Sequence, residues 1–384
     1  MSRSSTALTV LRSVAVIASS ALLLAACGGD DTDGDSAADA TTTTQPVAAA
    51  APTTTTTAPV DDRAWPGDEW PTIDLGEAGM DRASLDELAA TAEAADSQCL
   101  VVTRDGNLVD EWHWDGSTAD TEREAYSVTK SITATLVGIA QDQGHLDIDQ
   151  PASDFLTEWK GTPSEPITIR NLLSNDSGRF HDYQTDYVSM AVVAEDKSAF
   201  SIALTQQHDP GTVWAYNNAA IQTLEEVLER ATGTPVAEFA EEHLFDPLGV
   251  ESTMTTDTAG NTLAFMGLQT TCRDLARFGL LYLRGGEWDG DQVVSESFVA
   301  EAIAPSTELN PNYGFLWWLL GDAGATAPGQ TDLTDDSPSG YAAIGLGNQL
   351  VVVYPDTAVI VTRLGPFGEI GIAEISEWAR TVDP

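Results

Sequence analysis

Residues 127–143 read Ser-Val-Thr-Lys-Ser-Ile-Thr-Ala-Thr-Leu-Val-Gly-Ile-Ala-Gln-Asp-Gln, and Gly144 follows them. Apolar side chains recur along this stretch every three or four residues, at Val128, Ile132, Leu136, Ile139 and Ala140. That spacing predicts a buried helix from Val128 to Gln143, which Gly144 ends. The stretch thus supplies a core element of the fold, and its first turn also carries two chemically active side chains, Ser127 and Lys130.

Ser127 and Lys130 are three residues apart, so both side chains lie on one face of the predicted helix. Backbone N–H groups at a helix N-terminus are free and point outward. Burial and the helix dipole disfavour a lysine cation there, and a neutral amine can activate a neighbouring hydroxyl as a nucleophile. The tetrapeptide alone is a weak signal, because a core helix with an exposed, non-catalytic lysine could have the same four residues. Of the three lysines in the chain, only Lys130 follows a serine at this spacing.

The sequence around this helix divides into strands, then helices, then strands again. Strands are predicted at 99–103 and 108–114, around the turn Arg104-Asp105-Gly106-Asn107. A helical pattern at 84–95 precedes these strands, and others lie at 218–232 and 274–284, within a mostly helical stretch from about 168 to 286. Later strands are predicted at 313–320, 341–345, 349–354 and 359–364, before a helix at about 370–380. This order predicts an α/β fold: an antiparallel sheet flanked by helices, with an inserted all-helical lobe.

A second motif, Pro-Gly-Thr-Val-Trp-Ala-Tyr-Asn-Asn at 210–218, precedes one of the predicted helices. A phenol beside a Ser–Lys pair, held partly as phenolate by the cation, can act as general base and then as general acid, so Tyr216 is a candidate. Asn218 is a candidate for orienting Lys130 and a substrate carbonyl. Taken separately, Tyr216 could be a core aromatic and Asn218 a helix N-cap. Trp214 is a candidate substrate-binding residue.

The third motif, Gly-Tyr-Ala-Ala-Ile-Gly-Leu-Gly-Asn-Gln at 340–349, joins two predicted strands. A strand edge made of small residues lets backbone N–H groups face a cleft, and acyl transfer needs two such donors for the oxyanion. The N–H groups of Ser127 and Leu346 are the candidates for this oxyanion hole, and Gly345 is a candidate for substrate binding. A tight turn between two strands is required under either interpretation.

In this order the three motifs resemble the β-lactamase-related serine hydrolases. That group holds class C β-lactamases, penicillin-binding DD-peptidases, family VIII esterases and 6-aminohexanoate-dimer hydrolases. Further similar stretches, which extend the resemblance over nearly everything from Trp65 onward, lie at 167–173, 245–250, 273–279 and 313–318. The resemblance implies the serine β-lactamase and DD-peptidase fold. It also implies that Ser127 is the acylated nucleophile, that Lys130 and Tyr216 are the acid–base pair, and that Asn218 is the orienting amide.

Two departures from the family pattern bear on the substrate. β-Lactamases and DD-peptidases usually carry Lys-Thr-Gly on the third strand of the site, where the lysine meets the substrate carboxylate. Here the stretch is Ala343-Ile344-Gly345, without a charge. The loop after Leu173 reads Asn-Asp-Ser-Gly at 175–178, where the relatives usually have Thr-Ser-Gly. The missing charge favours the esterase and amino-acid-oligomer amidase branch over β-lactam recognition.

The start of the chain predicts export. Arg3 and Arg12 precede an apolar run from Val14 to Ala26, which is too short to span a bilayer and is typical of a signal peptide over residues 1–26. Leu-Ala-Ala-Cys at 24–27 resembles a bacterial lipobox, in which Cys27 is lipidated and becomes the mature N-terminus. An ordinary secretory signal with a chance cysteine is the alternative.

Three segments are therefore expected. After the signal peptide, residues 27–64 are rich in Asp, Thr, Ala and Pro, and they are expected to form a disordered tether. The catalytic domain is expected at 65–384, with its α/β part at about 65–150 and 290–384 and its helical lobe at about 151–289. A lipid anchor at Cys27 would hold this domain at the membrane, on the extracytoplasmic side of the cell.

Charge and cysteine content limit the partners and cofactors. The formal net charge is −43, and removal of Arg3 and Arg12 with the signal peptide leaves 15 basic against 60 acidic side chains, or −45. Such a surface argues against nucleic acid and anionic lipid as partners. Cys99 and Cys272 could pair outside the cytoplasm, although sequence alone does not place them within bridging distance. No metal-binding spacing occurs among the five histidines, so no metal or other cofactor is expected.

These observations together predict a hydrolase that acts through a covalent Ser127 ester on small esters or amides, including linear amino-acid oligomers such as the 6-aminohexanoate dimer. One alternative is a DD-peptidase or weak β-lactamase acting on cell-wall peptide, which a carboxylate-binding arginine near Leu346 would favour. Another is a non-catalytic binding lipoprotein, which an occluded pocket over Ser127 would favour. The oligomeric state is not predicted.

Overall fold

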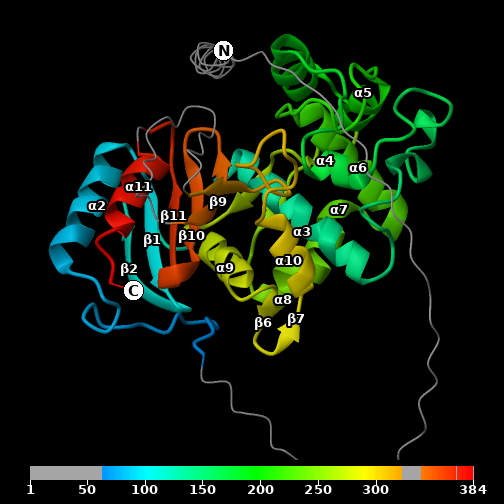
Figure 1. Cartoon of the computed structure of the whole chain (residues 1–384). Coiled ribbons are helices and arrows are strands. Elements are labelled where there is room, and N and C mark those ends of the chain that lie inside the picture. Colours follow the sequence, from blue (N-terminus) through cyan, green and yellow to red (C-terminus); the bar gives the residue numbers. More distant parts are fainter. Residues whose placement is uncertain (1–62, 322–338, 369, 384) are drawn as a thin grey trace, which may run out of the picture. The chain divides into compact units, whose positions relative to one another are not determined.

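Six antiparallel strands form the central sheet of this computed structural model, in the order β2-β1-β11-β10-β9-β8 (Figure 1). The structure describes residues 63–321, 339–368 and 370–383, and these form one compact unit. The predicted signal peptide, Cys27 and nearly all of the predicted tether lie outside the described residues. The strands of the sheet are β1 (Cys99–Arg104), β2 (Asn107–His113), β8 (Trp318–Leu320), β9 (Gly340–Gly345), β10 (Gln349–Tyr354) and β11 (Val359–Leu364).

Helices cover both faces of the sheet, because the side chains of its central strands alternate between two apolar clusters. Leu350 and Val352 of β10 pack with α2 (Arg82–Ala94) and α11 (Ile372–Ala379). Val351 and Val353 face the opposite side, in the larger cluster that includes α3 (Thr129–Asp142) and α9 (Cys272–Leu283). Figure 1 shows α2 and α11 together on one side of the sheet and α9 on the other.

The remaining elements build the helical part and its borders. The remaining helices are α4 (Ile169–Leu173), α5 (Lys197–Ala203), α6 (Asn218–Thr232), α7 (Val236–Ala240), α8 (Asp246–Leu248) and α10 (Glu296–Ala302), with π-helices at Gln184–Val193 and Glu241–Phe245. Short 3₁₀ turns lie at Tyr126–Val128, Ala152–Asp154, Thr157–Trp159 and Pro355–Thr357. Two small sheets are formed by β3 (Arg123–Glu124), β5 (Leu268–Thr270) and β4 (Thr253–Met254), and by β6 (Glu287–Trp288) and β7 (Asp291–Gln292).

The structure confirms the predicted fold class: an antiparallel sheet with flanking helices and a helical insertion. The hairpin between β1 and β2 turns where predicted, with positive φ at Asp105 (48°) and Gly106 (80°), the backbone that a tight two-residue hairpin requires. Gly144 (φ 77°) and Gly233 (φ 75°) adopt the left-handed conformation after α3 and α6, as predicted for residues that end helices.

Two expectations were wrong in extent. The predicted strand at 313–320 is a strand only at β8, because Leu316 has a φ of 59° and Gly314 packs so tightly that a Cβ would lie 2.0 Å from the Ala302 carbonyl oxygen. The predicted bounds of the helical lobe, about 151–289, were also too wide. Within its predicted range, α9 packs on β1, β10 and β11 of the sheet, with Gly279 against Ile360, and so belongs to the α/β part.

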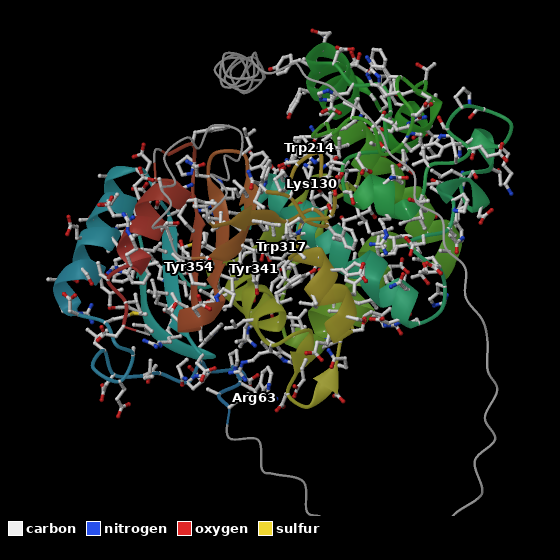
Figure 2. The ribbon with its side chains drawn as sticks, viewed as in Figure 1. Arg63, Lys130, Trp214, Trp317, Tyr341 and Tyr354 are labelled. Carbon is white, nitrogen blue, oxygen red and sulfur yellow. A yellow bond between two sulfur atoms is a disulfide. The ribbon has the colours of Figure 1, made fainter. Side chains whose placement is uncertain are left out.

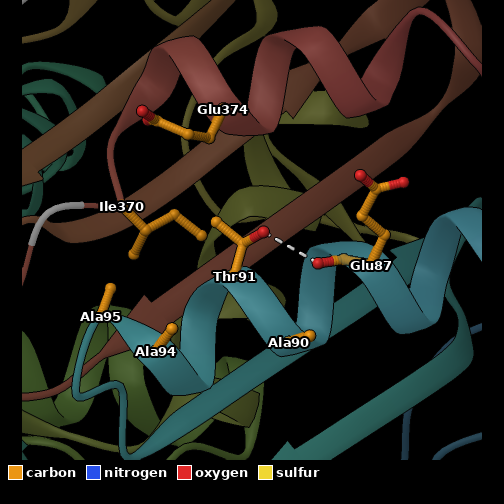
Figure 3. Close-up of a pocket in the computed structure, with 7 residues that line it drawn as sticks. All are labelled: Glu87, Ala90, Thr91, Ala94, Ala95, Ile370 and Glu374. Atoms are coloured by element: carbon orange, nitrogen blue, oxygen red, sulfur yellow. Dashed lines mark hydrogen bonds between the residues drawn. The ribbon is translucent and has the colours of Figure 1, made fainter.

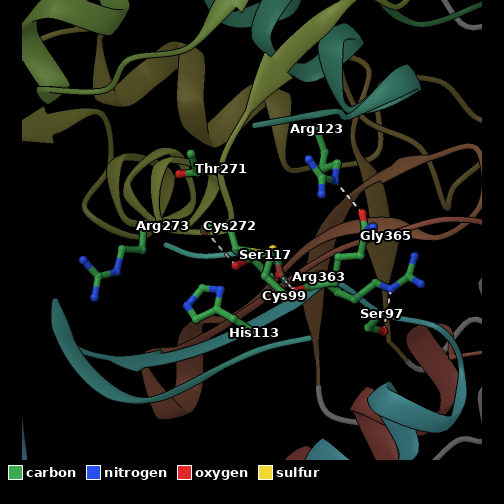
Figure 4. Close-up of a disulfide and its surroundings, with 12 residues drawn as sticks. Ser97, Cys99, His113, Ser117, Arg123, Thr271, Cys272, Arg273, Arg363 and Gly365 are labelled. Carbon is green, nitrogen blue, oxygen red and sulfur yellow. Dashed lines mark hydrogen bonds between the residues drawn. A yellow bond between two sulfur atoms is a disulfide. The ribbon is translucent and has the colours of Figure 1, made fainter. Parts of the chain in front are cut away.

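Cys99 on β1 and Cys272 at the start of α9 form a disulfide, with their Cα atoms 6.3 Å apart and a separation of 173 positions in sequence (Figure 4). This settles a pairing that the sequence left open. The cross-link restricts the unfolded chain and fixes the start of α9 to the sheet. It thereby also holds β5, whose Leu268 accepts a hydrogen bond from Ala125 N–H (2.8 Å) and donates one to Thr129 Oγ1 (3.0 Å). Both partners flank the turn that carries Ser127.

A surface groove of about 470 Å³ lies between α2 and α11, away from the predicted site (Figure 3). Its lining residues are Glu87, Ala90, Thr91, Ala94, Ala95, Ile370 and Glu374. None of the predicted catalytic residues lines this groove, so it is not the site of the predicted chemistry. Each helix within 63–321, 339–368 and 370–383 is too short or too polar to cross a membrane.

Candidate active site

Ser127 lies in a single 3₁₀ turn, Tyr126–Val128, that leads directly into the buried helix α3. Tyr126 has a φ of 47°, an uncommon conformation for a bulky side chain and one that is often found at functional sites. Val128 and Thr129 are buried, whereas Ser127 is only partly covered. The sharp turn therefore leaves the hydroxyl accessible at the start of an otherwise buried helix.

Lys130 is buried one turn further along, with an exposed fraction of 1%. Among the described residues, its Nζ donates hydrogen bonds to Ser127 Oγ (2.8 Å) and to the carbonyl oxygen of Phe265 (2.7 Å). Burial lowers the pKa of Lys130 to about 7, and the nearby Asp186 carboxylate opposes that shift. A large share of Lys130 is thus a neutral amine near pH 7, placed to accept the proton of Ser127.

Tyr216 lies against this pair; Figure 2 labels Lys130 and also Trp214, which belongs to the same chain segment as Tyr216. Its ring centroid is 4.9 Å from Lys130 Nζ. Burial raises the pKa of the Tyr216 phenol well above its usual range, although a hydrogen bond with the Ser127 side chain works in the opposite direction. This direction favours a neutral phenol over the partly ionised phenol that was expected, and it lets Lys130 lose its proton first. A neutral phenol remains able to donate a proton to a leaving group.

Asn218 begins α6, and its position differs from the prediction. Its side-chain nitrogen donates to the buried Asp186 carboxylate (2.7 Å), which also accepts the N–H groups of Asn218 (3.2 Å) and Ala219 (2.8 Å). The N-cap of α6 is Asn217, whose side chain accepts the Ala220 N–H. Asn218 thus contacts Asp186 and does not orient Lys130 directly. Asn218 instead fixes Asp186, whose charge raises the pKa of Lys130.

Trp214 belongs to an aromatic wall beside Tyr216. Its ring meets Tyr313 edge-on at 5.5 Å and Trp318 at 6.3 Å, and Tyr216 stacks on Trp318 at 5.8 Å. The indole nitrogen of Trp214 is buried and has no hydrogen-bond partner within the described part of the chain. The predicted substrate-binding residue therefore stands in an apolar wall next to the reactive groups.

The turn after β9 approaches the same place from the sheet. A Cβ on Gly345 would lie 2.1 Å from the carbonyl oxygen of Ala125, so only glycine lets the end of β9 pack against the segment before Ser127. Among the loop and turn hydrogen bonds of the described residues, none is donated by the Leu346 N–H. The structure thus brings Ser127, Lys130, Tyr216, Gly345 and Leu346 into one region, as the three motifs predict.

The arginine nearest to this turn is Arg363 on β11, which the structure buries completely. Its five N–H groups are all occupied, by Ser97 Oγ (2.8 Å) and by the carbonyl oxygens of Gly347 (2.7 Å), Asn348 (3.0 Å), Ala95 (3.2 Å) and Pro366 (3.0 Å). Arg363 therefore has no donor left for a substrate carboxylate.

Sequence reasoning missed three groups of the site. Phe265 acts through its backbone carbonyl, which carries no signal in the side-chain pattern. Asp186 lies in a π-helix with no recognisable motif, and only the fold brings it to the start of α6. Asn175 (φ 59°) replaces part of the usual family tripeptide; its carbonyl accepts the Ala215 N–H (2.9 Å), and its side chain accepts the Asn217 N–H (3.3 Å). The unusual loop thus supports the segment that carries Tyr216.

Comparisons with known proteins agree with this arrangement. The chain is 27% identical over 310 residues to the 6-aminohexanoate-dimer hydrolase of Paenarthrobacter ureafaciens, covering 73% of this chain and 75% of that protein. Among solved structures, a Bacillus anthracis protein with the provisional name 6-aminohexanoate-dimer hydrolase has a TM-score of 0.66 at 20% identity, covering 83% of this chain and 88% of that one. A D-stereospecific amidohydrolase from Streptomyces has a TM-score of 0.58 at 20% identity, covering 77% and 97%.

The solved structures show the fold alone at these identities, and the family itself is shown by sequence. The family model described as beta-lactamase matches residues 85–365, which include the Ser127–Lys130 turn, Tyr216 and the Gly345–Leu346 turn. The chain therefore belongs to the β-lactamase family.

Proposed function

We propose that this protein is a serine hydrolase that cleaves small esters or amides through a Ser127 acyl-enzyme, with linear amino-acid oligomers of the 6-aminohexanoate-dimer type among its substrates. One observation carries the proposal: a buried lysine with a pKa of about 7 lies 2.8 Å from the hydroxyl of a partly accessible serine. A lysine held in this way serves as a base for an acyl-transfer nucleophile. The similarity to the Paenarthrobacter ureafaciens enzyme supports an amide of this class.

The proposed reaction has two halves. Neutral Lys130 accepts the proton of Ser127 while Oγ attacks the substrate carbonyl carbon, and the N–H groups of Ser127 and Leu346 stabilise the oxyanion. As the tetrahedral intermediate collapses, the departing alcohol or amine takes a proton from Tyr216 or from protonated Lys130. Water then attacks the Ser127 ester, the same residues move its proton, and the free acid leaves.

The surroundings favour a substrate without a carboxylate next to the scissile bond. Ala343 stands where the β-lactamases and DD-peptidases carry a lysine, and it is buried with an exposed fraction of 1%. All five N–H groups of Arg363 are used by the protein, so Arg363 cannot be the carboxylate-binding arginine that would favour the DD-peptidase alternative. The assembled Ser127, Lys130 and Tyr216 likewise disfavour the non-catalytic alternative.

The missing charge leads to a prediction about selectivity. A charge-assisted hydrogen bond to a carboxylate contributes roughly 1.5–3 kcal/mol, so its absence costs about one to two orders of magnitude in kcat/KM. We expect a short-chain p-nitrophenyl ester to be hydrolysed at least about tenfold more efficiently than nitrocefin. Steady-state kinetics at two ionic strengths measure this, and higher salt is expected to narrow the gap by screening the acidic surface. Equal efficiency on both substrates would show that another residue binds the carboxylate.

We propose in addition that the protein is a lipoprotein held at the extracytoplasmic side of the membrane through Cys27. The support is the sequence at 24–27, which resembles a lipobox. Wild type is expected to fractionate with membranes in its host, whereas Cys27→Ser is expected to be released or left unprocessed. Fractionation with mass analysis of the N-terminal peptide measures both. A Cys27→Ser protein that is still acylated and membrane-bound would rule the proposal out.

A further inference from the structure

Side chains from two strands, Gln349 on β10 and Arg363 on β11, hold the turn at 345–348. Besides the Arg363 bonds to the carbonyls of Gly347 and Asn348, the side-chain nitrogen of Gln349 donates to Leu346 O (3.1 Å) and Gly365 O (2.7 Å). These contacts join the turn after β9 to the segment that follows β11. Two strands of the sheet thereby fix the backbone that carries the Leu346 N–H.

Room for the Arg363 guanidinium is provided by glycines in the sequence that follows it. A Cβ on Gly365 would lie 2.9 Å from Arg363 Nη2, and a Cβ on Gly368 would lie 2.7 Å from the same nitrogen. The Gly368 carbonyl also accepts the side-chain nitrogen of Asn348 (3.0 Å). Figure 4 shows Arg363 reaching Ser97 on the other side, near the disulfide.

Burying a guanidinium is costly unless each of its N–H groups finds an acceptor. All five acceptors of Arg363 are neutral, and burial lowers the pKa of Arg363 to about 10, which still leaves it cationic at neutral pH. An apolar residue of similar volume would satisfy the same core without this cost. What the arginine adds is a rigid, planar set of donors that fixes the two carbonyls of the turn relative to β11.

We propose that Arg363 is a positioning residue for acyl transfer: by holding Gly347 O and Asn348 O it keeps the Leu346 N–H where the oxyanion forms. The inference rests on the proposed function, because it presumes that Leu346 supplies one oxyanion donor. Loss of a single oxyanion donor lowers kcat by about 10²–10³-fold. We expect a displaced donor to lower it by roughly tenfold or more, with little change in KM.

The test compares an ester with its thionoester, in which sulfur replaces the carbonyl oxygen. An oxyanion hole stabilises O⁻ better than the larger and weaker acceptor S⁻, so a well-placed donor gives a high oxygen-to-sulfur ratio of kcat/KM. We expect Arg363→Gln to reduce that ratio by about fivefold or more, and Arg363→Lys to restore part of it. The ratio is measured on one preparation, so the amount of folded enzyme cancels.

Gly365→Ala is a second variant, because its Cβ would lie 2.9 Å from Arg363 Nη2, and 3.0 Å from the backbone at Asp96 and Gln98, while the arginine stays in place; it is expected to lower the same ratio. Arg277→Gln is the matched control. Arg277 is also buried, and within the described part of the chain its hydrogen bonds go to the carbonyl oxygens of Pro66 (2.9 Å), Leu248 (3.1 Å) and Gly67 (2.5 Å), none of which belongs to the turn. Its substitution is expected to affect stability and to leave the ratio unchanged.

The outcomes separate this inference from the proposed function. If Ser127 is acylated and the Arg363 and Gly365 variants keep the wild-type ratio and kcat, the positioning role is wrong while the hydrolase remains. If Arg277→Gln lowers the ratio equally, the effect is general loosening of the fold, and the role is again wrong. If wild type shows no acyl-enzyme at Ser127, the proposed function itself fails.

Discussion

Ser127→Ala is expected to lower kcat/KM for p-nitrophenyl butyrate by about four orders of magnitude or more, because removing the nucleophile of a covalent mechanism abolishes the acyl-enzyme route. The substitution removes one hydroxyl at a partly exposed turn, so the thermal unfolding temperature should change little. Initial rates measured by release of p-nitrophenol, together with a melting curve, give both quantities.

Ser131→Ala is the matched control for this variant. Ser131 lies one turn further along α3, is buried, and donates to the Leu316 carbonyl oxygen (2.8 Å). Its loss should cost about 1 kcal/mol of stability and leave the hydrolysis rate within a small factor of wild type. Unchanged turnover in Ser127→Ala would mean that a different group is acylated.

Lys130 should control the pH dependence of hydrolysis. The pKa of about 7 means that the amine is protonated, and unable to accept the Ser127 proton, in acid. We expect kcat/KM to rise by about tenfold per pH unit below that pKa and to level off above it. Lys130→Ala should lower kcat/KM at pH 8 by roughly 10²–10⁴-fold and remove the inflection. Lys130→Arg should be equally impaired, because a guanidinium stays charged.

One further variant tests the origin of that pKa, and a second is the control for Lys130→Ala. Asp186→Asn removes the negative charge that raises the pKa of Lys130, so the inflection should move to lower pH. Lys197→Ala is the matched control for Lys130→Ala. Lys197 also donates to a backbone carbonyl, Ala194 O at 2.7 Å, but has no serine three residues before it. An inflection that survives in Lys130→Ala would assign the base to another residue.

The sequence predicted the sheet and the nucleophile because both depend on local patterns. Alternating apolar residues in β10 and β11 define two buried faces, and the Ser127–Lys130 spacing places two side chains on one face of a helix. The exact bounds of β10 and β11 agree with the predicted 349–354 and 359–364. Where positive φ at Leu316 interrupts an apolar run, the pattern alone predicted too long a strand.

The electrostatics of the site depend on contacts between distant segments, so they could not be predicted from spacing. A phenolate at Tyr216 was expected because the lysine was treated as a cation. The fold buries Lys130 and packs the partly buried Tyr216 against it, which disfavours charge on either of them. Similarly, Asn218 was expected to orient Lys130. Its side chain instead donates to Asp186, which the π-helix at 184–193 brings to the start of α6 without any motif in the sequence.

The most direct measurement is the mass of the protein after reaction with a fluorophosphonate and, separately, after rapid quenching with a slowly hydrolysed ester. A serine hydrolase of this design should gain one phosphonyl group, and one acyl group from the ester, and peptide mapping should place both on Ser127. Ser127→Ala should gain neither. Labelling of the Ser127→Ala protein, or a wild-type label on any other residue, would contradict the account.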